Sequence, residues 1–347
     1  MALPLKPPYP PMEALLVDEI PAGPQWQYEP KWDGFRCLAF RDGDAIELQS
    51  KSGQPLGRYF PEVARSLKSL KAKKFILDGE IAISLGGAFS FDALLQRIHP
   101  AASRIKKLSE ETPATFIVFD LLAGPDGRPL ISLPLEERRR RLEAFARENF
   151  PDDSSIQLSP ATTDLNKAKS WLKMAGGALD GIVAKRLDFD YRSGERTGMR
   201  KVKRKRTADC VVGGFRYASN APVVGSILLG LYDKEGLLHH VGFSSGFSRD
   251  ERKKLLTKLK PLIEPPGFTG NAPGGPSRWS TERSTEWQPL APKLVVEVEY
   301  DHFTGHRFRH GTKVLRWRPD KAPRQCTLDQ VEVNKRGADA KLLKTGS

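Results

Sequence analysis

The chain has 347 residues, of which 39% are hydrophobic and 28% are charged, which is typical of a globular protein long enough for two domains. No apolar run approaches the roughly 20 residues of a membrane-spanning helix, which excludes that class of membrane protein. The formal net charge of +14 favours a polyanionic partner, and nucleic acid fits better than an anionic membrane because no basic amphipathic helix stands out.

The cysteines and the N-terminus indicate a cellular setting. The three cysteines (Cys37, Cys210 and Cys326) are far apart, and no pair has CxxC spacing. We therefore predict neither a zinc site nor a disulfide framework. Residues 1–12 are proline-rich and lack the apolar core of a signal peptide. We expect a cytoplasmic protein.

In chain order, residues 1–25 are predicted to be a lead-in with a short apolar anchor at 14–17. Hydrophobic periodicity then predicts strands and helices in alternation. The predicted strands are 35–40 and 45–49, joined by a hairpin turn, and 75–83, 115–122 and 179–185. The predicted helices are 61–70, 91–108, 135–150 and 165–175. The arginine run 138–141 is expected to be a mostly solvated face.

Lys31 stands between two acids, Glu29 and Asp33, where one apolar segment ends and another begins. A lysine in such surroundings is often only a solvated surface charge. A junction between two strands can also present a side chain to a cleft. We interpret Lys31 as a nucleophile because of the residues that follow it.

An acid is paired with glycine three times, at Asp33-Gly34, Asp78-Gly79-Glu80 and Asp180-Gly181. Each pair alone is compatible with a simple turn. Acids inside apolar strands are costly unless they are paired or bound to something. Three such pairs at strand positions in a basic protein suggest carboxylates gathered around a metal or a ribose.

The composition changes abruptly near residue 192. Eight of the fifteen residues from 192 to 206 are lysine or arginine. A basic run of this kind is often a linker or a solvated arm. Lys201-Val202-Lys203 nevertheless alternates like a strand, so that both lysines would point to the same side, into a cleft. We place the domain boundary just after this run.

The remainder of the chain is rich in predicted strands. These are 210–217, 223–232, 237–243, 294–300 and 314–318, with one helix at 249–262. This order fits a small Greek-key barrel of the oligonucleotide-binding type, the OB fold. The predicted domains are 1–205, 206–335 and a tail at 336–347.

The ordered motifs resemble those of the covalent nucleotidyltransferases, and most of all the ATP-dependent DNA ligases. Their Lys-x-Asp-Gly-x-Arg motif is matched by residues 31–36, and their Asp-Gly-Glu strand by residues 78–80. Five further motifs are matched in order by Ser50-Lys51-Ser52-Gly53, Phe119-Asp120, Asp180-Gly181 to Lys185, Lys201-Val202-Lys203, and Arg318-Pro319-Asp320-Lys321. The sequence at 29–36 and the length of the chain most resemble those of the small bacterial ligase of the C type.

Three positions depart from the family pattern. Lys51 replaces an arginine and cannot form its planar fork. Asp180 replaces a glutamate and is one methylene shorter. The segment before Lys201 lacks the usual tryptophan, so the family's arginine there corresponds to Arg196 or Arg192.

The resemblance implies an α+β nucleotidyltransferase (adenylation) domain with antiparallel sheets, followed by an all-β OB-fold barrel. It also implies three nucleotidyl transfers, in which Lys31 takes AMP from ATP, passes it to the 5′-phosphate of a nick, and the 3′-hydroxyl then displaces it. A lysine must lose its proton to attack, and nearby cations would lower its pKa.

The resemblance also implies roles for particular residues. The expected catalytic residues are Lys31, Lys201, Lys203, Arg318, Asp320 and Lys321. The expected nucleotide-binding residues are Glu29, Lys31, Arg36, Lys51, Glu80, Phe119, Val183, Lys185, Arg196, Lys201 and Lys203. The expected ligands of Mg²⁺, with Mn²⁺ as the alternative metal, are Glu80, Asp180 and Asp33. Without the resemblance, Phe119 would be interpreted as a core aromatic residue.

The expected partner is nicked duplex DNA, bound through phosphates by residues 200–206, by the arginines 138–141 and by the surface of the barrel. We expect a monomer that acts in DNA repair, with other repair proteins as further partners. We also expect it to be associated with the bacterial nucleoid through DNA. Two alternatives stay open: an RNA ligase or capping-type guanylyltransferase that shares these motifs, and an inactive module that binds nicks.

Overall fold

The computed structural model describes residues 3–151, 155–174, 179–274 and 286–331. The chain forms two compact units that divide between Arg204 and Lys205, and each unit has its own hydrophobic core. No helix among the described residues is long and apolar enough to cross a membrane. The predicted tail at 336–347 lies outside the described residues.

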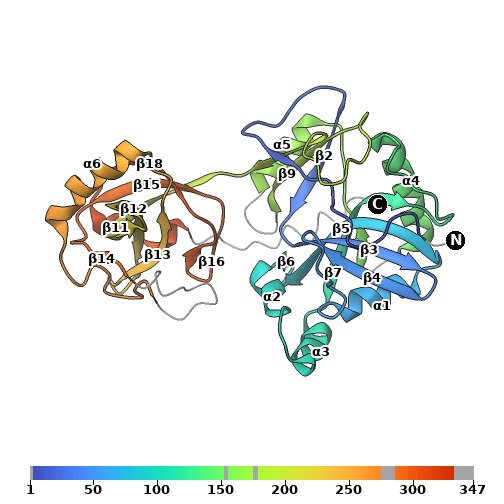
Figure 1. Cartoon of the computed structure of the whole chain (residues 1–347), viewed down its shortest axis with the longest axis horizontal. Coiled ribbons are helices and arrows are strands. Elements are labelled where there is room, and N and C mark those ends of the chain that lie inside the picture. The colour runs from blue at the N-terminus through green and yellow to red at the C-terminus, as the bar shows by residue number, and fades with distance from the viewer. Residues whose placement is uncertain (1–2, 152–154, 175–178, 275–285, 332–347) are drawn as a thin grey trace. The chain divides into compact units, whose positions relative to one another are not determined.

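The first unit contains two main sheets in which most pairings are antiparallel (Figure 1). The larger sheet has the strand order β4 (Ala45–Ser50), β3 (Phe35–Asp42), β5 (Lys74–Leu85), β7 (Ala114–Ala123) and β8 (Ile156–Leu158), and the short β6 (Ala88–Phe89) pairs with β5. The smaller sheet has the order β1 (Leu15–Leu16), β10 (Met199–Lys203), β9 (Leu179–Arg186) and β2 (Trp26–Trp32). Both sheets contribute strands to the site described below.

Helices cover these sheets. The largest core of the first unit includes residues of α1 (Pro61–Ser69), α4 (Leu135–Asn149) and the larger sheet. The helix α5 (Leu165–Met174) packs Ala168 and Trp171 against Tyr28 and Ile182 of the smaller sheet. The predicted hairpin at 41–44 is present, since Asp42 pairs with Ala45 and Gly43 has a φ of 64°.

The single helix predicted at 91–108 is wrong. The chain instead forms α2 (Phe91–Gln96) and α3 (Ala102–Glu111), separated by a segment that contains Pro100. Proline disfavours the helical conformation of the residue before it, which breaks a helix that the apolar spacing alone would continue.

The apolar anchor predicted at 14–17 is also wrong. Leu15 is 43% exposed and Leu16 is 55% exposed. The segment is held by its backbone instead, because β1 pairs in parallel with β10, with Leu16 opposite Lys201. The lead-in therefore lies beside a strand that carries predicted site residues.

The second unit is an OB-like sheet with the order β13 (Leu238–Ser244), β12 (Ala221–Tyr232), β11 (Arg206–Ala218), β15 (Val295–Tyr300) and β18 (Lys313–Trp317). The minor strands are β14 (Gln288–Pro289), β16 (Phe303–Thr304) and β17 (Arg307–Phe308). The prediction of a closed barrel is wrong, because β13 and β18 form no ladder among the described residues. An isolated bridge between Ser244 and Thr312 brings these two edges near each other.

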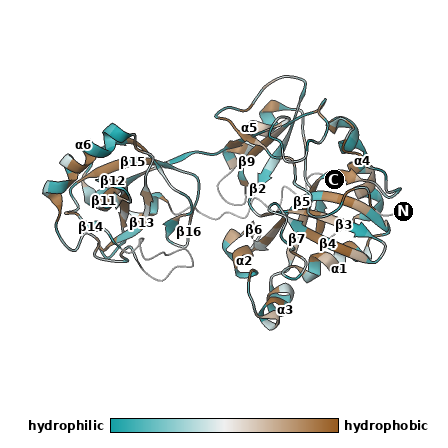
Figure 2. Ribbon diagram, viewed as in Figure 1, coloured by the Kyte–Doolittle hydropathy of each residue, from teal (hydrophilic) through white to brown (hydrophobic). Residues whose placement is uncertain are grey.

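Hydropathy follows this architecture in both units. The central strands are mainly hydrophobic, whereas the outer helix α6 (Arg249–Leu259) is mainly hydrophilic (Figure 2). Ser248 begins α6 with a capping box to Glu251. The helix buries Leu255 and Leu259 and leaves its charged residues in solvent. This fold class of an adenylation-type α+β unit followed by an OB-like unit is the predicted one.

Candidate active site

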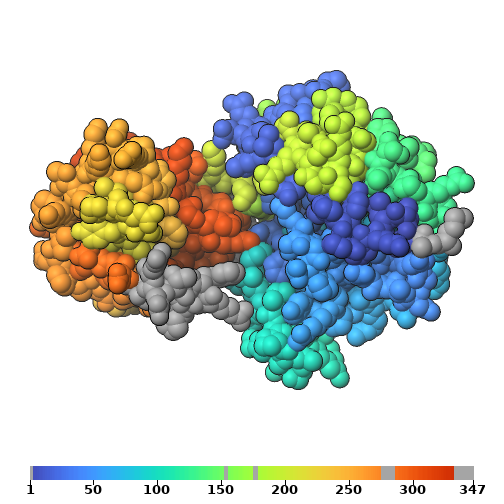
Figure 3. All heavy atoms as spheres, viewed as in Figure 1, coloured from blue at the N-terminus to red at the C-terminus, as the bar shows by residue number. Residues whose placement is uncertain are grey.

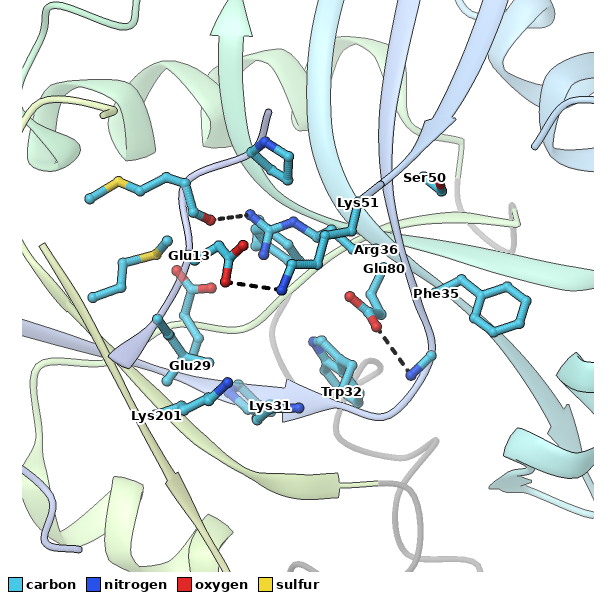
Figure 4. Close-up of a pocket in the computed structure, with 18 of the residues that line it drawn as sticks. Glu13, Glu29, Lys31, Trp32, Phe35, Arg36, Ser50, Lys51, Glu80 and Lys201 are labelled. Carbon is cyan, nitrogen blue, oxygen red and sulfur yellow. Dashed lines mark hydrogen bonds and ion pairs between the residues drawn. The ribbon is translucent and has the colours of Figure 1, made fainter. Parts of the chain in front are cut away.

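A cavity of about 830 Å³ opens in the first unit between the two sheets and the N-terminal segment (Figure 4). Nine predicted site residues line it: Glu29, Lys31, Arg36, Lys51, Glu80, Phe119, Val183, Lys185 and Lys201. They come from β2, β3, β5, β7, β9 and β10 and from the loop after β4. The fold thus gathers residues that are spread over most of the first unit's sequence.

Lys31 lies near the end of β2, where the pairing with β9 is irregular between Lys31 and Trp32. Its Nζ lies 2.5 Å from Oδ2 of Asp180, and the Lys203 Nζ lies 3.3 Å from the same oxygen. Asp180 is 4% exposed and Lys31 is 23% exposed. The amine is thus accessible from the cavity and is held by a buried carboxylate that it shares with a second lysine.

Lys201 and Lys203 alternate with Val202 as predicted, but of the two lysines only Lys201 lines the cavity. In β10, Lys201 lies opposite Val183 and Lys203 lies opposite Gly181, with the buried Val202 between them. Lys201 lines the cavity, and its pKa is lowered by burial and then by the charges of Lys31, Lys51 and Lys203. These cations create a positive region that suits a phosphate chain.

Two glycines allow the strands around Lys31 to approach closely. A Cβ atom on Gly34 would collide with the carbonyl oxygen of Ile81. Gly181 has a φ of 151°, and a Cβ atom there would collide with the carbonyl oxygen of Val202. The Asp-Gly pairs at these positions therefore place their acids beside Lys31 by close backbone packing.

Glu80 lies on β5 and accepts a hydrogen bond of 3.1 Å from the Gly34 backbone N–H. Burial raises the pKa of Glu80 to about 7, against the lowering effect of Lys31 and Arg36. A bound cation would favour the ionised form of this carboxylate.

The side chains near Lys31 meet the requirements of a magnesium site only in part. Glu80 and Asp180 are oxygen donors near Lys31, and Mg²⁺ is often bound through one or two carboxylates with several waters. No group of three or more His, Cys, Asp or Glu side chains able to hold a metal exists among the described residues. Asp33 therefore gains no support as a third ligand.

Phe119 is 9% exposed and lines the cavity. The Arg36 guanidinium and the Lys185 ammonium each lie 4.5 Å from the centre of its ring. Lys185 pairs with Glu29 at 2.8 Å, and both side chains are buried. Val183 lies opposite Glu29 in the pairing of β9 with β2. Phe119, Val183 and both members of this ion pair thus line the cavity.

Arg36 lines the cavity but already has a partner. Its guanidinium binds both oxygens of Asp78 at 2.5 and 2.6 Å, and a further N–H donates to the Met12 carbonyl at 3.3 Å. The Tyr191 hydroxyl also donates to Asp78, at 2.7 Å. Sequence reasoning missed Tyr191 altogether. The only sequence signal for this contact is that Asp78, a buried acid in an apolar strand, requires hydrogen-bonding partners.

At the mouth of the cavity Lys51 and Arg196 meet on one carboxylate. Glu13, which sequence reasoning missed, accepts from Lys51 at 3.0 Å and from Arg196 at 2.9 Å. The alternative arginine, Arg192, pairs with Asp190 instead. Of the two candidates, Arg196 is thus the one beside another predicted site residue.

The last motif lies in the second unit. Arg318 pairs with Asp209 at 2.9 Å and with Asp320 at 2.8 Å, and Lys321 pairs with Asp209 at 2.7 Å. Asp209, on β11, was not predicted. Arg318 and Lys321 thus form one cluster around a common carboxylate.

The arginine run 138–141 is not the solvated DNA-binding face that was predicted. Arg138 is 2% exposed and binds both oxygens of Asp120 at 2.9 and 3.1 Å, and Arg139 is 8% exposed. Only Arg140 and Arg141 are exposed, and both pair with Glu137. The helix α4 buries one side of its arginine run because Asp120 lies beneath it.

Comparison with known proteins adds independent findings. A family model described as "ATP dependent DNA ligase domain" matches residues 12–203, and one described as "ATP dependent DNA ligase C terminal region" matches residues 220–321. The chain is 43% identical to DNA ligase C of Mycobacterium tuberculosis and 46% identical to DNA ligase C1 of Mycolicibacterium smegmatis, in each case over 96% of both chains.

Among solved structures, the one titled "Pmar-Lig_Pre." aligns with a TM-score of 0.58 at 18% identity, covering 84% of this chain and 63% of that chain. This similarity supports the fold alone. The two family matches lie within the two compact units, with the first ending just before the division at Arg204.

Proposed function

The chain belongs to the ATP-dependent DNA ligases, and from that premise we propose that it seals nicks between a 3′-hydroxyl and a 5′-phosphate in duplex DNA through a lysyl-AMP on Lys31. The observation that carries the proposal is the Lys31 amine, which is accessible in the cavity and held by Asp180 at 2.5 Å among further cations. ATP is the nucleotide of the family, and a role in DNA repair follows from the sealing of nicks.

In the first transfer the Lys31 Nζ attacks the α-phosphorus of ATP. A nitrogen–phosphorus bond forms, the bond to the bridging oxygen breaks, and pyrophosphate leaves. The amine must lose its proton to attack. The positive charges of Lys201 and Lys203 would attract the phosphates of ATP.

A magnesium ion held by Glu80 and Asp180 would neutralise phosphate charge when bound. Glu80 suits this role because burial raises its pKa, and a bound cation would stabilise the ionised carboxylate. Alternatively, Glu80 would contact the ribose of ATP.

The adenine would lie between Phe119 and Val183, which both line the cavity. Phe119 would stack on one face of the base and Val183 would contact the other. The Glu29 side chain is engaged by Lys185, so its contact with the adenine edge would use the backbone. Arg36 faces the Phe119 ring and would hold the ribose while it remains bound to Asp78.

In the second and third transfers, AMP moves to the 5′-phosphate and the 3′-hydroxyl then displaces it. Contacts to DNA are expected to be mostly to phosphates, from residues 200–206 and from the surface of the second unit. Arg318 and Lys321 would orient pyrophosphate in the first transfer, with Asp320 holding the Arg318 guanidinium.

The test is incubation of the protein with Mg²⁺ and α-labelled ATP, followed by a denaturing gel. Acid-labile label is expected on the wild type and on Lys107→Ala, an exposed control, and is expected to be absent from Lys31→Ala. Sealing of a nicked duplex with labelled 5′-phosphate then tests the acceptor. Absence of label on wild type, after removal of any AMP already bound, would support the inactive nick-binding alternative.

The RNA ligase and capping alternatives predict different substrates. A capping-type enzyme would take label from α-labelled GTP, and an RNA ligase would prefer RNA at the nick. The identity to curated DNA ligases over nearly the whole chain supports the DNA ligase proposal over both.

A further inference from the structure

We propose that Tyr191 is a positioning residue of the nucleotide site, and that its hydroxyl fixes the orientation of the Arg36 guanidinium. It does so through the Asp78 carboxylate and through the backbone of Met12. The inference deepens the proposed ligase function and rests on it, because Arg36 is proposed there to hold the ribose of ATP. Tyr191 does not itself line the cavity, so it would act on the nucleotide only through other residues.

The four residues form a closed ring of hydrogen bonds. The Tyr191 hydroxyl donates to Oδ2 of Asp78 at 2.7 Å and accepts from the Met12 N–H at 3.0 Å. Nη2 of Arg36 donates to the same Oδ2 at 2.6 Å and to the Met12 carbonyl at 3.3 Å. Nε of Arg36 donates to Oδ1 of Asp78 at 2.5 Å. One hydroxyl therefore joins the two acceptors, a carboxylate and a backbone segment, that hold the guanidinium.

The ring leaves one nitrogen of Arg36 available to a ligand. Nε and Nη2 are engaged, whereas Nη1 has no hydrogen-bond partner among the residues that the structure describes. Arg36 lines the cavity, and its guanidinium lies 4.5 Å from the centre of the Phe119 ring (Figure 4). Because a guanidinium is planar and rigid, fixing two of its nitrogens also fixes the third. Nη1 beside the proposed adenine site is thus suited to donate to a ribose hydroxyl.

The Tyr191 hydroxyl is a buried donor. Tyr191 is 5% exposed and Asp78 is 0% exposed. Burial, and then the charge of Asp78, raise the pKa of Tyr191 well above its ordinary value, so the hydroxyl keeps its proton and donates to the carboxylate. Without the hydroxyl, the buried Met12 N–H would lose its acceptor and Asp78 would lose a donor. Both changes occur at groups that Arg36 contacts directly.

The N-terminal segment is also held by neighbouring contacts. Three further hydrogen bonds of 2.6–3.3 Å join residues 10–13 to residues 193–195, from Ser193 to Pro10, from Gly194 to Pro11 and from Glu13 to Glu195. In the space-filling view the N-terminal segment, in the darkest blue, lies against the yellow-green residues near 190 (Figure 3). Removing the Tyr191 hydroxyl would therefore alter the geometry at Met12 and Arg36 while the segment stays attached.

The variant Tyr191→Phe separates the hydroxyl from the aromatic ring. The ring belongs to a buried apolar cluster with Leu38 and Met199 and lies 5.6 Å from the Arg138 guanidinium, and phenylalanine retains these contacts. The matched control is Tyr28→Phe. It removes the hydroxyl of another buried tyrosine of the first unit, which donates to the Pro21 carbonyl at 2.8 Å and does not line the cavity.

The experiment measures the rate of lysyl-AMP formation against the concentration of ATP, 2′-deoxyATP and 3′-deoxyATP. The wild type is expected to use ATP more efficiently than at least one deoxynucleotide, which lacks the oxygen that Nη1 would contact. Tyr191→Phe is expected to reduce this preference about threefold to tenfold, chiefly by raising the half-saturating concentration of ATP. Tyr28→Phe is expected to keep the preference of the wild type.

A second pair of variants tests whether Tyr191 acts through Arg36. When Tyr191→Phe is added to Arg36→Lys, the preference is expected to change less than about twofold, because lysine has no planar fork to orient. A full effect of Tyr191→Phe in the Arg36→Lys protein would show that the hydroxyl does not act through the guanidinium, which overturns the inference.

Three further outcomes also overturn it: a wild type without preference, an equal change in Tyr28→Phe, and a Tyr191→Phe protein that is slowed alike with all three nucleotides. The last result would assign a merely structural role to the hydroxyl. Because the preference compares nucleotides on the same protein, an unfolded fraction does not alter it. If Tyr191→Phe does not fold, Asp78→Asn tests the same ring and is expected to lose the preference. Absence of lysyl-AMP from the wild type is a separate result, which contradicts the ligase function itself.

Discussion

At the scale of single residues, the proposed chemistry depends on the carboxylate of Asp180, which Lys31 and Lys203 share. It lies within 2.5 Å of the Lys31 amine and 3.3 Å of the Lys203 amine. Two lysines so close together repel each other unless an anion lies between them. Asp180 therefore holds the Lys31 and Lys203 amines at one point.

We predict that Asp180→Asn slows lysyl-AMP formation at least about tenfold, because the variant loses both the partner that positions Lys31 and a proposed metal ligand. Single-turnover labelling with α-labelled ATP measures this rate. Asp188→Asn, which removes an exposed carboxylate paired with Arg186, is the control and is expected to match the wild type. A rate for Asp180→Asn within twofold of the wild type would contradict the proposed role.

A buried histidine in the second unit makes the stability depend on pH. His240 is 5% exposed, and its Nδ1 lies 3.3 Å from Nη2 of Arg307. Burial, and then Arg307 and Arg216, lower the pKa of His240 to about 3. The unfolded chain binds a proton at this residue below about pH 6.5, whereas the folded chain does not. Its effect is therefore absent above that pH, and it destabilises the fold as the pH falls toward 3.

We predict that His240→Gln makes the second unit less sensitive to acid. Between about pH 6 and pH 4 the free energy of unfolding of the wild type should fall more steeply than that of the variant, by up to about 1.4 kcal/mol per pH unit. Urea unfolding at several pH values measures both slopes. His310→Gln, at a half-exposed histidine, is the control. Parallel slopes for wild type and His240→Gln would disprove the prediction.

At the scale of elements, the active site depends on the close approach of β9 and β10. Lys203 lies opposite Gly181, and the neighbouring pairs carry Val183 opposite Lys201. The same β9 residues pair with β2 on the other side, where Lys31 lies opposite Gly181. One glycine thus lies between the nucleophile strand and the Lys-x-Lys strand.

We predict that Gly181→Ala lowers the free energy of unfolding by about 1–3 kcal/mol, because the added Cβ meets the Val202 carbonyl and the residue has a positive φ. The rate of lysyl-AMP formation should fall as well, since β9 would shift away from β10. Urea unfolding and labelling measure the two effects. Gly57→Ala, where a Cβ would have open space, is the control. If Gly181→Ala retains wild-type stability, close packing does not explain this glycine.

At the scale of the whole molecule, the catalytic motifs are divided between two units. The first unit contains the cavity and Lys31, whereas Arg318, Asp320 and Lys321 belong to the second. Arg318 and Lys321 both pair with Asp209 of their own unit. A role for them at the pyrophosphate would require Asp209 to release or share its partners.

We predict that Arg318→Ala slows lysyl-AMP formation more than tenfold but slows the sealing of a nick that already carries AMP less than threefold, because pyrophosphate takes part only in the first transfer. The two rates are measured with labelled ATP and with pre-adenylylated nicked DNA. Arg316→Ala, two residues away and paired with Glu297, is the control. Equal losses in both steps would contradict a role limited to the first.

The sequence by itself determined which residues are proposed to carry the chemistry and in which elements most of them lie. Lys31, Glu80 and the lysines of β10 were identified because motif order and strand alternation are local properties of the chain. The helix predicted at 91–108 failed for an equally local reason, because apolar spacing continued through Pro100 and was given more weight than the proline.

Only the tertiary structure decided the partners of these residues. Tyr191 meets Asp78 across 113 positions of sequence, and Arg196 meets Glu13 across 183. Arg138 is buried rather than solvated because Asp120 lies beneath it. A periodic pattern shows which face a side chain occupies, but the ion pair it forms depends on what the folded chain brings opposite. That information is carried by long-range packing, so the pairing of Glu13 with Lys51 and Arg196 became visible only in three dimensions.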